Sequence, residues 1–337
     1  RLAPDSAEPR SPGPTPRQAA GRTDAGGFRC ARPRSVGTTT LPAVTSDDPE
    51  HPKTAGEIVD LSAEPLPTPT FALAENPLWD AEADTLYWTD IDAGQVWTRS
   101  PGGTATRIYQ GPKVGGFTLE RDGALLLFRE TDIAHFDPLT SELRRLAEFH
   151  EHGTERFNDV AALPDGSALA GTIGQNTTQT RLHLVRRGEA GITLAPISGT
   201  DTRISNGLAL SPDRTAIHWT DTTNAVIARF ALGSGGPSQR TDLIHTADEN
   251  AGFPDGLCAD DRGNLYSARW AGGRIVVYGP AGNRLGAVSV PDADNVTSAC
   301  FGGADRRTLF ITTAGGPLYH AAMPIPGPPD PRTSLAQ

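Results

Sequence analysis

The feature that most restricts the fold is a repeat with a period of roughly forty to fifty residues. In each copy an apolar strand leads into a turn built on Asp, Pro or Gly, and then into a second strand rich in aromatic and β-branched residues. The equivalent positions, spaced by 39, 44, 48, 48 and 44 residues, are Leu86, Leu125, Leu169, Ile217, Leu265 and Leu309. Each unit has room for two more strands, so the sequence predicts an all-β fold, a six-bladed β-propeller.

The two ends of the chain differ from the repeats. Residues 1–56 are rich in Pro, Arg, Ser, Thr and Gly and have no sustained apolar period, which predicts a disordered tail. Residues 57–323 hold the propeller, and the Pro-rich residues 324–337 are expected to form a frayed tail. The sixth unit lacks an outermost strand, so we expect the N-terminal strand Glu57–Leu61 to complete it and close the ring.

Charge and composition exclude several classes of partner. The chain carries a net charge of −10, and no basic stripe stands out, which argues against nucleic acid and anionic membranes as partners. It contains no apolar run of about 18 residues, so no membrane span is expected. We also find no leader of signal-peptide type. The 3 cysteines lie far apart without a Cys-x-x-Cys pair, which predicts reduced thiols and a cytoplasmic protein.

Four of the repeats place an oxygen-bearing side chain immediately before their first strand. These residues are Glu75, Asn158, Asn206 and Asp255. In a ring of blades, equivalent positions converge on the axis, where two carboxylates and two amides would form an oxygen-only shell for a divalent cation. Ca²⁺ suits such a shell first, and Zn²⁺, Mg²⁺, Mn²⁺ and Fe²⁺ remain open. Turn chemistry is the competing interpretation, because Asn-Gly and Pro-Asp-Gly are common in tight turns.

Five stretches carry a resemblance to a known family. They are Leu73–Trp79, Arg156–Asp159, Ser205–Leu208, Pro254–Leu257 and Thr297–Gly303. In this order and spacing the chain resembles the SMP-30/gluconolactonase/luciferin-regenerating-enzyme (LRE) family over residues 57–323. The resemblance implies a six-bladed propeller that acts as a metal-dependent hydrolase, in most members a sugar lactonase.

The resemblance also implies roles for individual residues. Glu75, Asn206 and Asp255 match the metal ligands, and Arg156 and Asn158 match the substrate-binding pair. The family often has an acidic residue soon after the stretch that corresponds to Gly171–Ile173, whereas Gly174-Gln175-Asn176 follows here. The side chains that contact the sugar hydroxyls therefore differ from those of the family, and the resemblance does not identify which lactone is preferred.

The expected activity is gluconolactonase-like hydrolysis of a sugar lactone. The cation would polarise the lactone carbonyl, and Asp255 would act as general base. Arg156 would offer donors to the substrate, although an ion pair with Glu155 or Asp159 is an alternative role. Phe253 and Trp270 could form an apolar wall of the pocket.

Two rival functions share the same residues. One is a phosphotriesterase-like hydrolase, because the same oxygen shell suits a phosphoryl oxygen. The other is a non-catalytic ligand-binding propeller with structural calcium. A closed ring has no need of a partner chain, so a monomer or weak oligomer is expected, with a small-molecule sugar lactone as its ligand.

Overall fold

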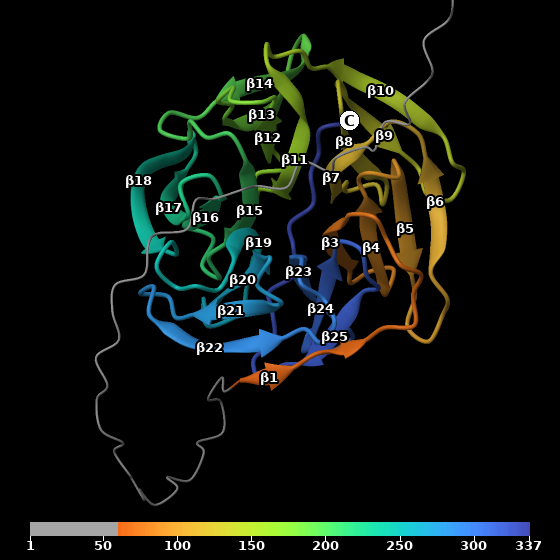
Figure 1. The fold of residues 1–337 in the computed structure, drawn as a ribbon. Coiled ribbons are helices and arrows are strands. Elements are labelled where there is room, and N and C mark those ends of the chain that lie inside the picture. Colours follow the sequence, from red (N-terminus) through yellow and green to blue (C-terminus); the bar gives the residue numbers. More distant parts are fainter. Residues whose placement is uncertain (1–59) are drawn as a thin grey trace, which may run out of the picture. The chain divides into compact units, whose positions relative to one another are not determined.

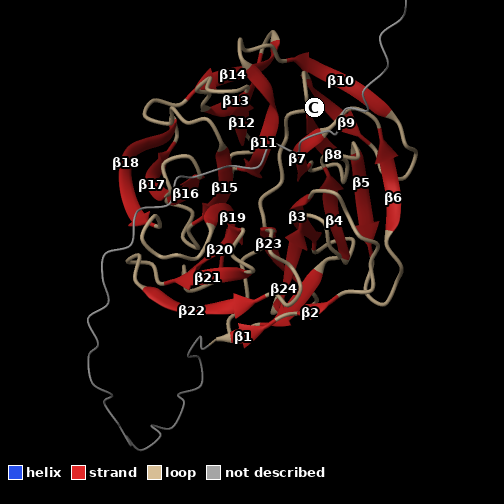
Figure 2. Cartoon of the chain, viewed as in Figure 1, coloured by secondary structure: helices blue, strands red, loops and turns tan. Residues whose placement is uncertain are grey.

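The structure, a computed structural model, describes residues 60–337, which lie within one compact unit. All regular secondary structure in this range is β-strand, as Figure 2 shows. No helix long and apolar enough to cross a membrane occurs in the described range. Of the expected closing strand, Glu57–Val59 lie outside the described residues, as does the expected tail 1–56.

Four sheets are built from four consecutive strands each, and a fifth sheet begins in the same way. Blade one contains β3 (Ala74–Asp80), β4 (Thr85–Asp90), β5 (Gln95–Arg99) and β6 (Thr106–Gln110). Blade two contains β7 (Val114–Leu119), β8 (Leu125–Arg129), β9 (Asp132–Phe136) and β10 (Leu143–Glu148). Blade three contains β11 (Thr154–Ala162), β12 (Ala168–Gly174), β13 (Leu182–Gly188) and β14 (Gly191–Pro196). Blade four contains β15 (Ser205–Leu210), β16 (Ala216–Asp221), β17 (Val226–Gly233) and β18 (Gly236–His245). Blade five contains β19 (Phe253–Ala259), β20 (Leu265–Trp270), β21 (Arg274–Tyr278) and β22 (Arg284–Ser289).

Blade six is completed from the other end of the chain. Its own strands are β23 (Val296–Gly302), β24 (Thr308–Thr313) and β25 (Tyr319–Ala322), and β2 (Glu64–Pro65) pairs antiparallel with β25 as the outermost strand. The six-bladed propeller closed by an N-terminal strand is therefore confirmed.

The segment that closes the ring is not the predicted one. Leu61 lies in β1 (Leu61–Ser62), which pairs in parallel with β22 and adds a fifth strand to blade five. The closing strand β2 is exposed and polar, and its Pro65 fits an edge position because an edge strand can lack an N–H donor. An apolar pattern could not identify such a strand.

The innermost strands β3, β7, β11, β15, β19 and β23 surround the centre of the ring, and the outermost strands lie at its edge (Figure 1). Six apolar clusters fill the spaces between neighbouring blades. Trp88 and Trp219 are fully buried in two of these clusters. Side chains that alternate along each strand are thus buried on both faces of every blade. This packing fixes the blades relative to one another.

Residues 324–337, expected to be a frayed tail, are instead bound to the ring. Thr333 N donates to Leu119 O at 2.8 Å, and Ser334 N donates to Gly166 O at 2.9 Å. Arg332 Nη2 lies 2.6 Å from Asp80 Oδ1. The prediction was wrong because Pro-rich composition argues against regular structure only. A chain without regular structure is still fixed when its polar groups find partners.

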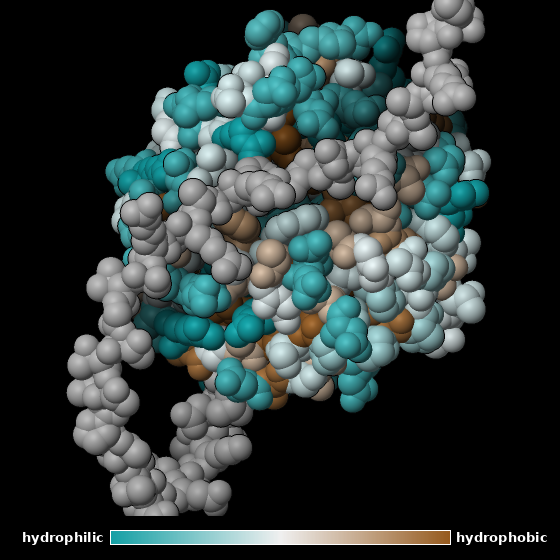
Figure 3. All heavy atoms as spheres, in the orientation of Figure 1, coloured by the Kyte–Doolittle hydropathy of each residue, from teal (hydrophilic) through white to brown (hydrophobic). Residues whose placement is uncertain are grey.

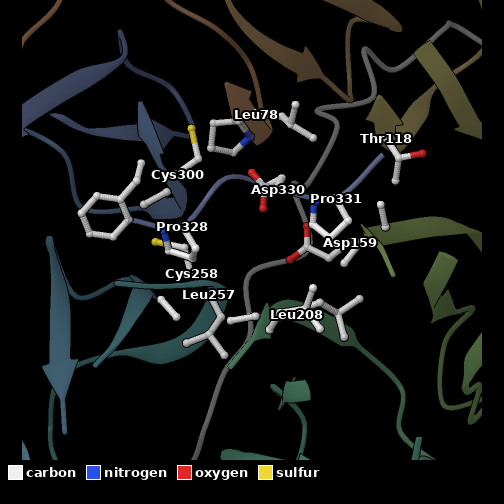
Figure 4. A pocket seen from close by; sticks show the side chains of 18 of the residues that line it. Leu78, Thr118, Asp159, Leu208, Leu257, Cys258, Cys300, Pro328, Asp330 and Pro331 are labelled. Atoms are coloured by element: carbon white, nitrogen blue, oxygen red, sulfur yellow. The ribbon is translucent and has the colours of Figure 1, made fainter. Parts of the chain in front are cut away.

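The bound tail crosses the centre of the ring at one end of the inner strands. Its partners Asp80 and Leu119 are the last residues of β3 and β7. In Figure 4, Asp330 and Pro331 of the tail lie near the centre of the view, with Leu78 above them and Leu208 and Leu257 below them, and these three leucines belong to inner strands. Beside the tail, a cavity of about 100 Å³ remains in the channel. The tail therefore covers the end of the channel opposite to the beginnings of the inner strands.

Shortening Leu335 tests this attachment. Its side chain is 2% exposed and packs with Leu126 and Phe128 of blade two. We expect Leu335→Ala to reduce the free energy of unfolding by roughly 2–5 kcal/mol, the usual cost of such a cavity. Leu139→Ala is the matched control, because Leu139 is 94% exposed and its loss should change stability by less than about 0.5 kcal/mol. Denaturant titration measures both, and equal stabilities would mean that the tail is not attached.

Candidate active site

Every inner strand carries an irregularity of pairing near its beginning. The register with the second strand shifts between Glu75 and Leu78 in blade one and between Pro254 and Leu257 in blade five. Corresponding shifts occur in the other four blades. The four predicted site residues lie inside the inner strands, at these β-bulges, and not before the strands as expected. A bulge redirects side chains that regular pairing would turn toward the neighbouring blade.

Glycines allow the inner strands to approach one another at the bulges. A Cβ atom on Gly207 would lie 2.3 Å from Leu257 N, and one on Gly256 would lie 2.2 Å from Ser298 Oγ. Both distances are far below van der Waals contact. The Asn-Gly and Asp-Gly pairs of the sequence therefore serve close contact between blades, and they bring the side chains before each glycine to the same mouth of the channel.

A chain of hydrogen bonds joins three blades across this mouth. Arg156 Nη1 donates to Asn158 Oδ1, and Asn158 Nδ2 donates to Asn206 Oδ1, each at 2.5 Å. Asn206 Nδ2 donates to Thr222 Oγ1 at 2.8 Å, and that hydroxyl donates to Pro254 O, next to Asp255, at 2.6 Å. Arg156, Asn158 and Asn206 are thus brought together and oriented, and the chain ends at the residue before Asp255.

Three buried carboxylates lie beside this chain. Glu75, Asp159 and Asp255 are each about 5% exposed. Burial, followed by repulsion from Asp255 and Asp159, raises the pKa of Glu75 well above its ordinary value. Burial and then repulsion from Asp159 raise the pKa of Asp255. Burial raises the pKa of Asp159 to about 7, and Arg156 opposes this shift.

These carboxylates carry more negative charge than their protein neighbours balance. The guanidinium of Arg156 opposes the rise of all three pKa values without cancelling it. Glu75 Oε2 and Asp159 Oδ2 are also buried without a hydrogen-bond partner. Buried oxygens of this kind fit a cation. Among residues 60–337, no group of three His, Cys, Asp or Glu side chains has the spacing to hold a metal by itself. A cation at this place would therefore need a further oxygen ligand, such as the amide oxygen of Asn206.

Asp159 is the residue that sequence reasoning did not assign to the site. Its only signal in the sequence is its place next to Asn158, which suggests no more than an ion pair with Arg156. In the structure its carboxylate lines the channel cavity, and Figure 4 shows it near the middle of the ring.

Asn76 and the turn after β12 have local structural roles. Asn76 has a positive φ of 46°, and its Oδ1 accepts a hydrogen bond from Phe117 N at 2.5 Å, which ties blade one to blade two. Gln175 and Asn176 lie in the turn after β12, where Gln175 N donates to Gly153 O at 2.7 Å. Both stretches are thus held by hydrogen bonds to neighbouring segments.

Comparisons with known proteins identify the family of this chain. Residues 73–315 match the model of the SMP-30/Gluconolactonase/LRE-like region. A pentonolactonase of Haloferax volcanii is 34% identical over 247 residues, which cover 72% of this chain and 82% of that protein. A 6-deoxy-6-sulfogluconolactonase of Pseudomonas putida is 34% identical over 246 residues, covering 72% of this chain and 83% of that protein.

A solved structure supports the fold. The calcium-binding protein regucalcin from Agrobacterium tumefaciens superimposes with a TM-score of 0.75, at 22% identity, over 83% of this chain and 100% of that chain. At this identity the likeness concerns the fold alone.

Proposed function

Because this chain belongs to the SMP-30/gluconolactonase/LRE-like family, we propose that it is a sugar lactonase that opens its substrate with the help of one divalent cation. The curated relatives at 34% identity are lactonases, which supports this reaction class. The observation that carries the proposal is the set of three buried carboxylates whose charges interact, with Arg156 as their counter-charge and two carboxylate oxygens unpartnered.

Glu75, Asn206 and Asp255 would hold the cation. Their oxygens are hard ligands, and Ca²⁺ is the first candidate for such a shell, with Zn²⁺, Mg²⁺, Mn²⁺ and Fe²⁺ as alternatives. When bound, the cation supplies Lewis-acid polarisation of the lactone carbonyl and neutralises the buried negative charge.

Asp255 is the proposed general base. It takes a proton from the attacking water, whose oxygen forms the new bond to the carbonyl carbon. The bond between that carbon and the ring oxygen then breaks, and the proton passes from Asp255 to the ring oxygen. The products are a hydroxyl and a carboxylic acid, which releases its own proton to solvent and becomes a carboxylate.

Arg156 and Asn158 are the proposed substrate-binding residues. The side chain of Arg156 is 7% exposed and is oriented by hydrogen bonds from Nη1 to Phe157 O, at 2.9 Å, and to Asn158 Oδ1. A guanidinium fixed in this way directs its donors at the substrate oxygens and at the carboxylate that forms on ring opening.

Substituting Arg156 by lysine tests this role. We expect Arg156→Lys to raise KM for the lactone by about tenfold or more, because an ammonium cannot reproduce the planar fork of donors. Steady-state kinetics on purified protein measure the change. Arg145→Lys is a control, because Arg145 is exposed on the outer strand β10 and pairs with Glu148. Equal KM values in the two variants would contradict the role of Arg156.

The whole proposal is tested with parallel substrate panels. Aldonolactones and organophosphate esters are offered to the protein after chelation, and each divalent cation is then added back in turn. Lactone hydrolysis that returns with a cation supports the proposal. Ester hydrolysis alone would indicate a phosphotriesterase-like enzyme. Cation binding without turnover of either panel would indicate a non-catalytic propeller.

A further inference from the structure

On the face of the molecule drawn in Figure 3, polar side chains prevail and apolar ones gather in small separate patches. Among the described residues on this face, no broad apolar surface marks a docking site for a partner. The hydrogen bonds inside the ring are more specific. The chain of bonds that runs from Arg156 to Pro254 joins blades three, four and five, and each of its members donates in one direction only.

The two ends of this chain of bonds fix its direction. Arg156 can only donate, because a guanidinium has no acceptor, and its Nη1 donates to Asn158 Oδ1. The carbonyl oxygen of Pro254 can only accept, and it accepts the hydroxyl proton of Thr222 at 2.6 Å. Every group between these ends must therefore donate in the same direction, from blade three toward blade five.

Thr222 decides how the amide of Asn206 is oriented. The hydroxyl of Thr222 has one proton, which Pro254 O accepts, so toward Asn206 the hydroxyl can only accept. It accepts from Asn206 Nδ2 at 2.8 Å, and Asn206 Oδ1 is thereby left to face Asn158 Nδ2 at 2.5 Å. An amide turned by half a rotation would oppose two acceptors at Thr222 and two donors at Asn158. The NH2 group and the oxygen of Asn206 therefore have only one favourable arrangement.

The turn that carries Thr222 is itself held in place. Thr222 follows Asp221, the last residue of β16, whose Cα is the cross-strand partner of Ser205 at the beginning of β15. The buried carboxylate of Asp221 accepts from Asn224 N at 3.1 Å and from Asn224 Nδ2 at 2.7 Å. Thr222 N donates to Ile204 O at 3.3 Å. The hydroxyl of Thr222 is thus fixed relative to the inner strand of its own blade.

We propose that Thr222 is a positioning residue for the cation site. Its hydroxyl keeps the oxygen of Asn206, and not the NH2 group, available to a cation, and it holds the backbone next to Asp255. One hydroxyl thus relates two proposed ligands that belong to neighbouring blades. The inference rests on the proposed function, because Asn206 and Asp255 are ligands only under that proposal. A hard cation binds an amide through its oxygen, so a turned amide would present two N–H groups to the cation and weaken its binding.

Removing the hydroxyl tests the inference. Thr222→Val keeps the shape of the side chain, but it leaves Asn206 Nδ2 and Pro254 O without this partner, so the amide can turn. The full chain is treated with a chelator, freed of it, and titrated calorimetrically with Ca²⁺ first and then with Mg²⁺, Mn²⁺ and Zn²⁺. We expect the dissociation constant of the bound cation to rise about 10–100-fold in Thr222→Val, the usual effect of losing a partner that orients a ligand.

Two further variants separate the hydroxyl from the rest of the side chain. Thr222→Ser keeps the hydroxyl and should bind the cation as the wild type does. The matched control Thr215→Val removes a hydroxyl that donates to Asp213 Oδ2 at 2.9 Å, in an exposed turn that precedes β16, whereas Thr222 follows β16. This control should leave the dissociation constant unchanged. Thermal unfolding with a chelator shows whether each variant is folded, and Thr222→Ala replaces Thr222→Val if the latter is not.

The outcomes distinguish this inference from the proposed function. An unchanged dissociation constant in Thr222→Val would overturn the inference. Equal weakening in Thr222→Ser would also overturn it, because the hydroxyl would then not be the cause. Cation binding by the wild type without any lactone hydrolysis would contradict the proposed function alone, since the affinities of the variants still decide the role of Thr222. A wild type that binds none of the four cations would overturn both.

Discussion

Substituting Asp255 by asparagine is expected to lower kcat for lactone hydrolysis by about 10²–10⁴-fold while the propeller stays folded. Asparagine keeps the shape of the side chain and an oxygen for a cation, but it cannot accept a proton from water. Burial and repulsion from Asp159 raise the pKa of Asp255, so the charged form is unfavourable in the protein without a cation. The variant should therefore be at least as stable as the wild type in the presence of a chelator.

The contrast between activity and stability makes this prediction specific. Steady-state kinetics with a saturating cation and thermal unfolding with a chelator are measured on the same preparation. A matched control is Asp261→Asn, because Asp261 lies in the turn after β19, where its carboxylate is partly exposed. Wild-type kcat in Asp255→Asn would rule out the proposed base, and a loss of kcat with a lower unfolding temperature would point to a structural role.

The second large effect concerns the stability of the metal-free protein, kept so by a chelator. We expect its free energy of unfolding to fall as the pH rises. Burial raises the pKa of Asp159 to about 7 from an unfolded value near 3.8, so between these pH values the folded state binds more protons than the unfolded state. Stability contributed by this group is complete below about pH 4 and is lost as the pH rises toward 7. A shift of about three pKa units corresponds to about 4 kcal/mol. Glu75 and Asp255 shift in the same direction.

Urea denaturation at several pH values between 5 and 8 measures this loss. We expect the chelated protein to lose several kcal/mol of stability over this range, and a saturating divalent cation to restore most of it by neutralising the carboxylates. The variant Asp159→Asn isolates one contribution and should show a shallower pH dependence than the wild type. If the free energy of unfolding changed with pH by the same amount in both proteins, Asp159 would ionise without cost in the folded state, contrary to its burial.

Asp159 is a site residue that could not be predicted from the sequence, unlike its neighbours in the site. Asn158, Asn206 and Asp255 came from their common place in the repeat, and Arg156 came from the family resemblance. The structure joins Arg156, Asn158 and Asn206 by hydrogen bonds and brings the chain of bonds to the residue before Asp255. Their roles as ligands, base and substrate contacts stay predictions. Asp159 has no sequence signal of its own, because its importance comes from carboxylates that belong to other blades.

The bulges and the tail show the same limit for the fold. The site residues were expected before the inner strands, but they lie within them, because a bulge keeps a strand continuous while it redirects one side chain. The tail 324–337 was read from its composition, whereas its attachment depends on partners such as Leu119 and Gly166, more than 150 residues earlier in the chain. The composition of a segment indicates that it will not form a helix or strand by itself. It does not indicate which other parts of the protein the segment will contact.

The sequence by itself determined the number of blades, the position of each blade along the chain and the stretches that carry the candidate site. In a propeller, each blade buries apolar residues at equivalent positions of the repeat. The local pattern of apolar residues and turns therefore shows where each blade begins and ends. Only the tertiary structure decided which strand closes the ring, that the tail covers one end of the channel, and that Asp159 joins Glu75 and Asp255. These features arise from contacts between residues far apart in sequence, and such contacts exist only once the ring has closed.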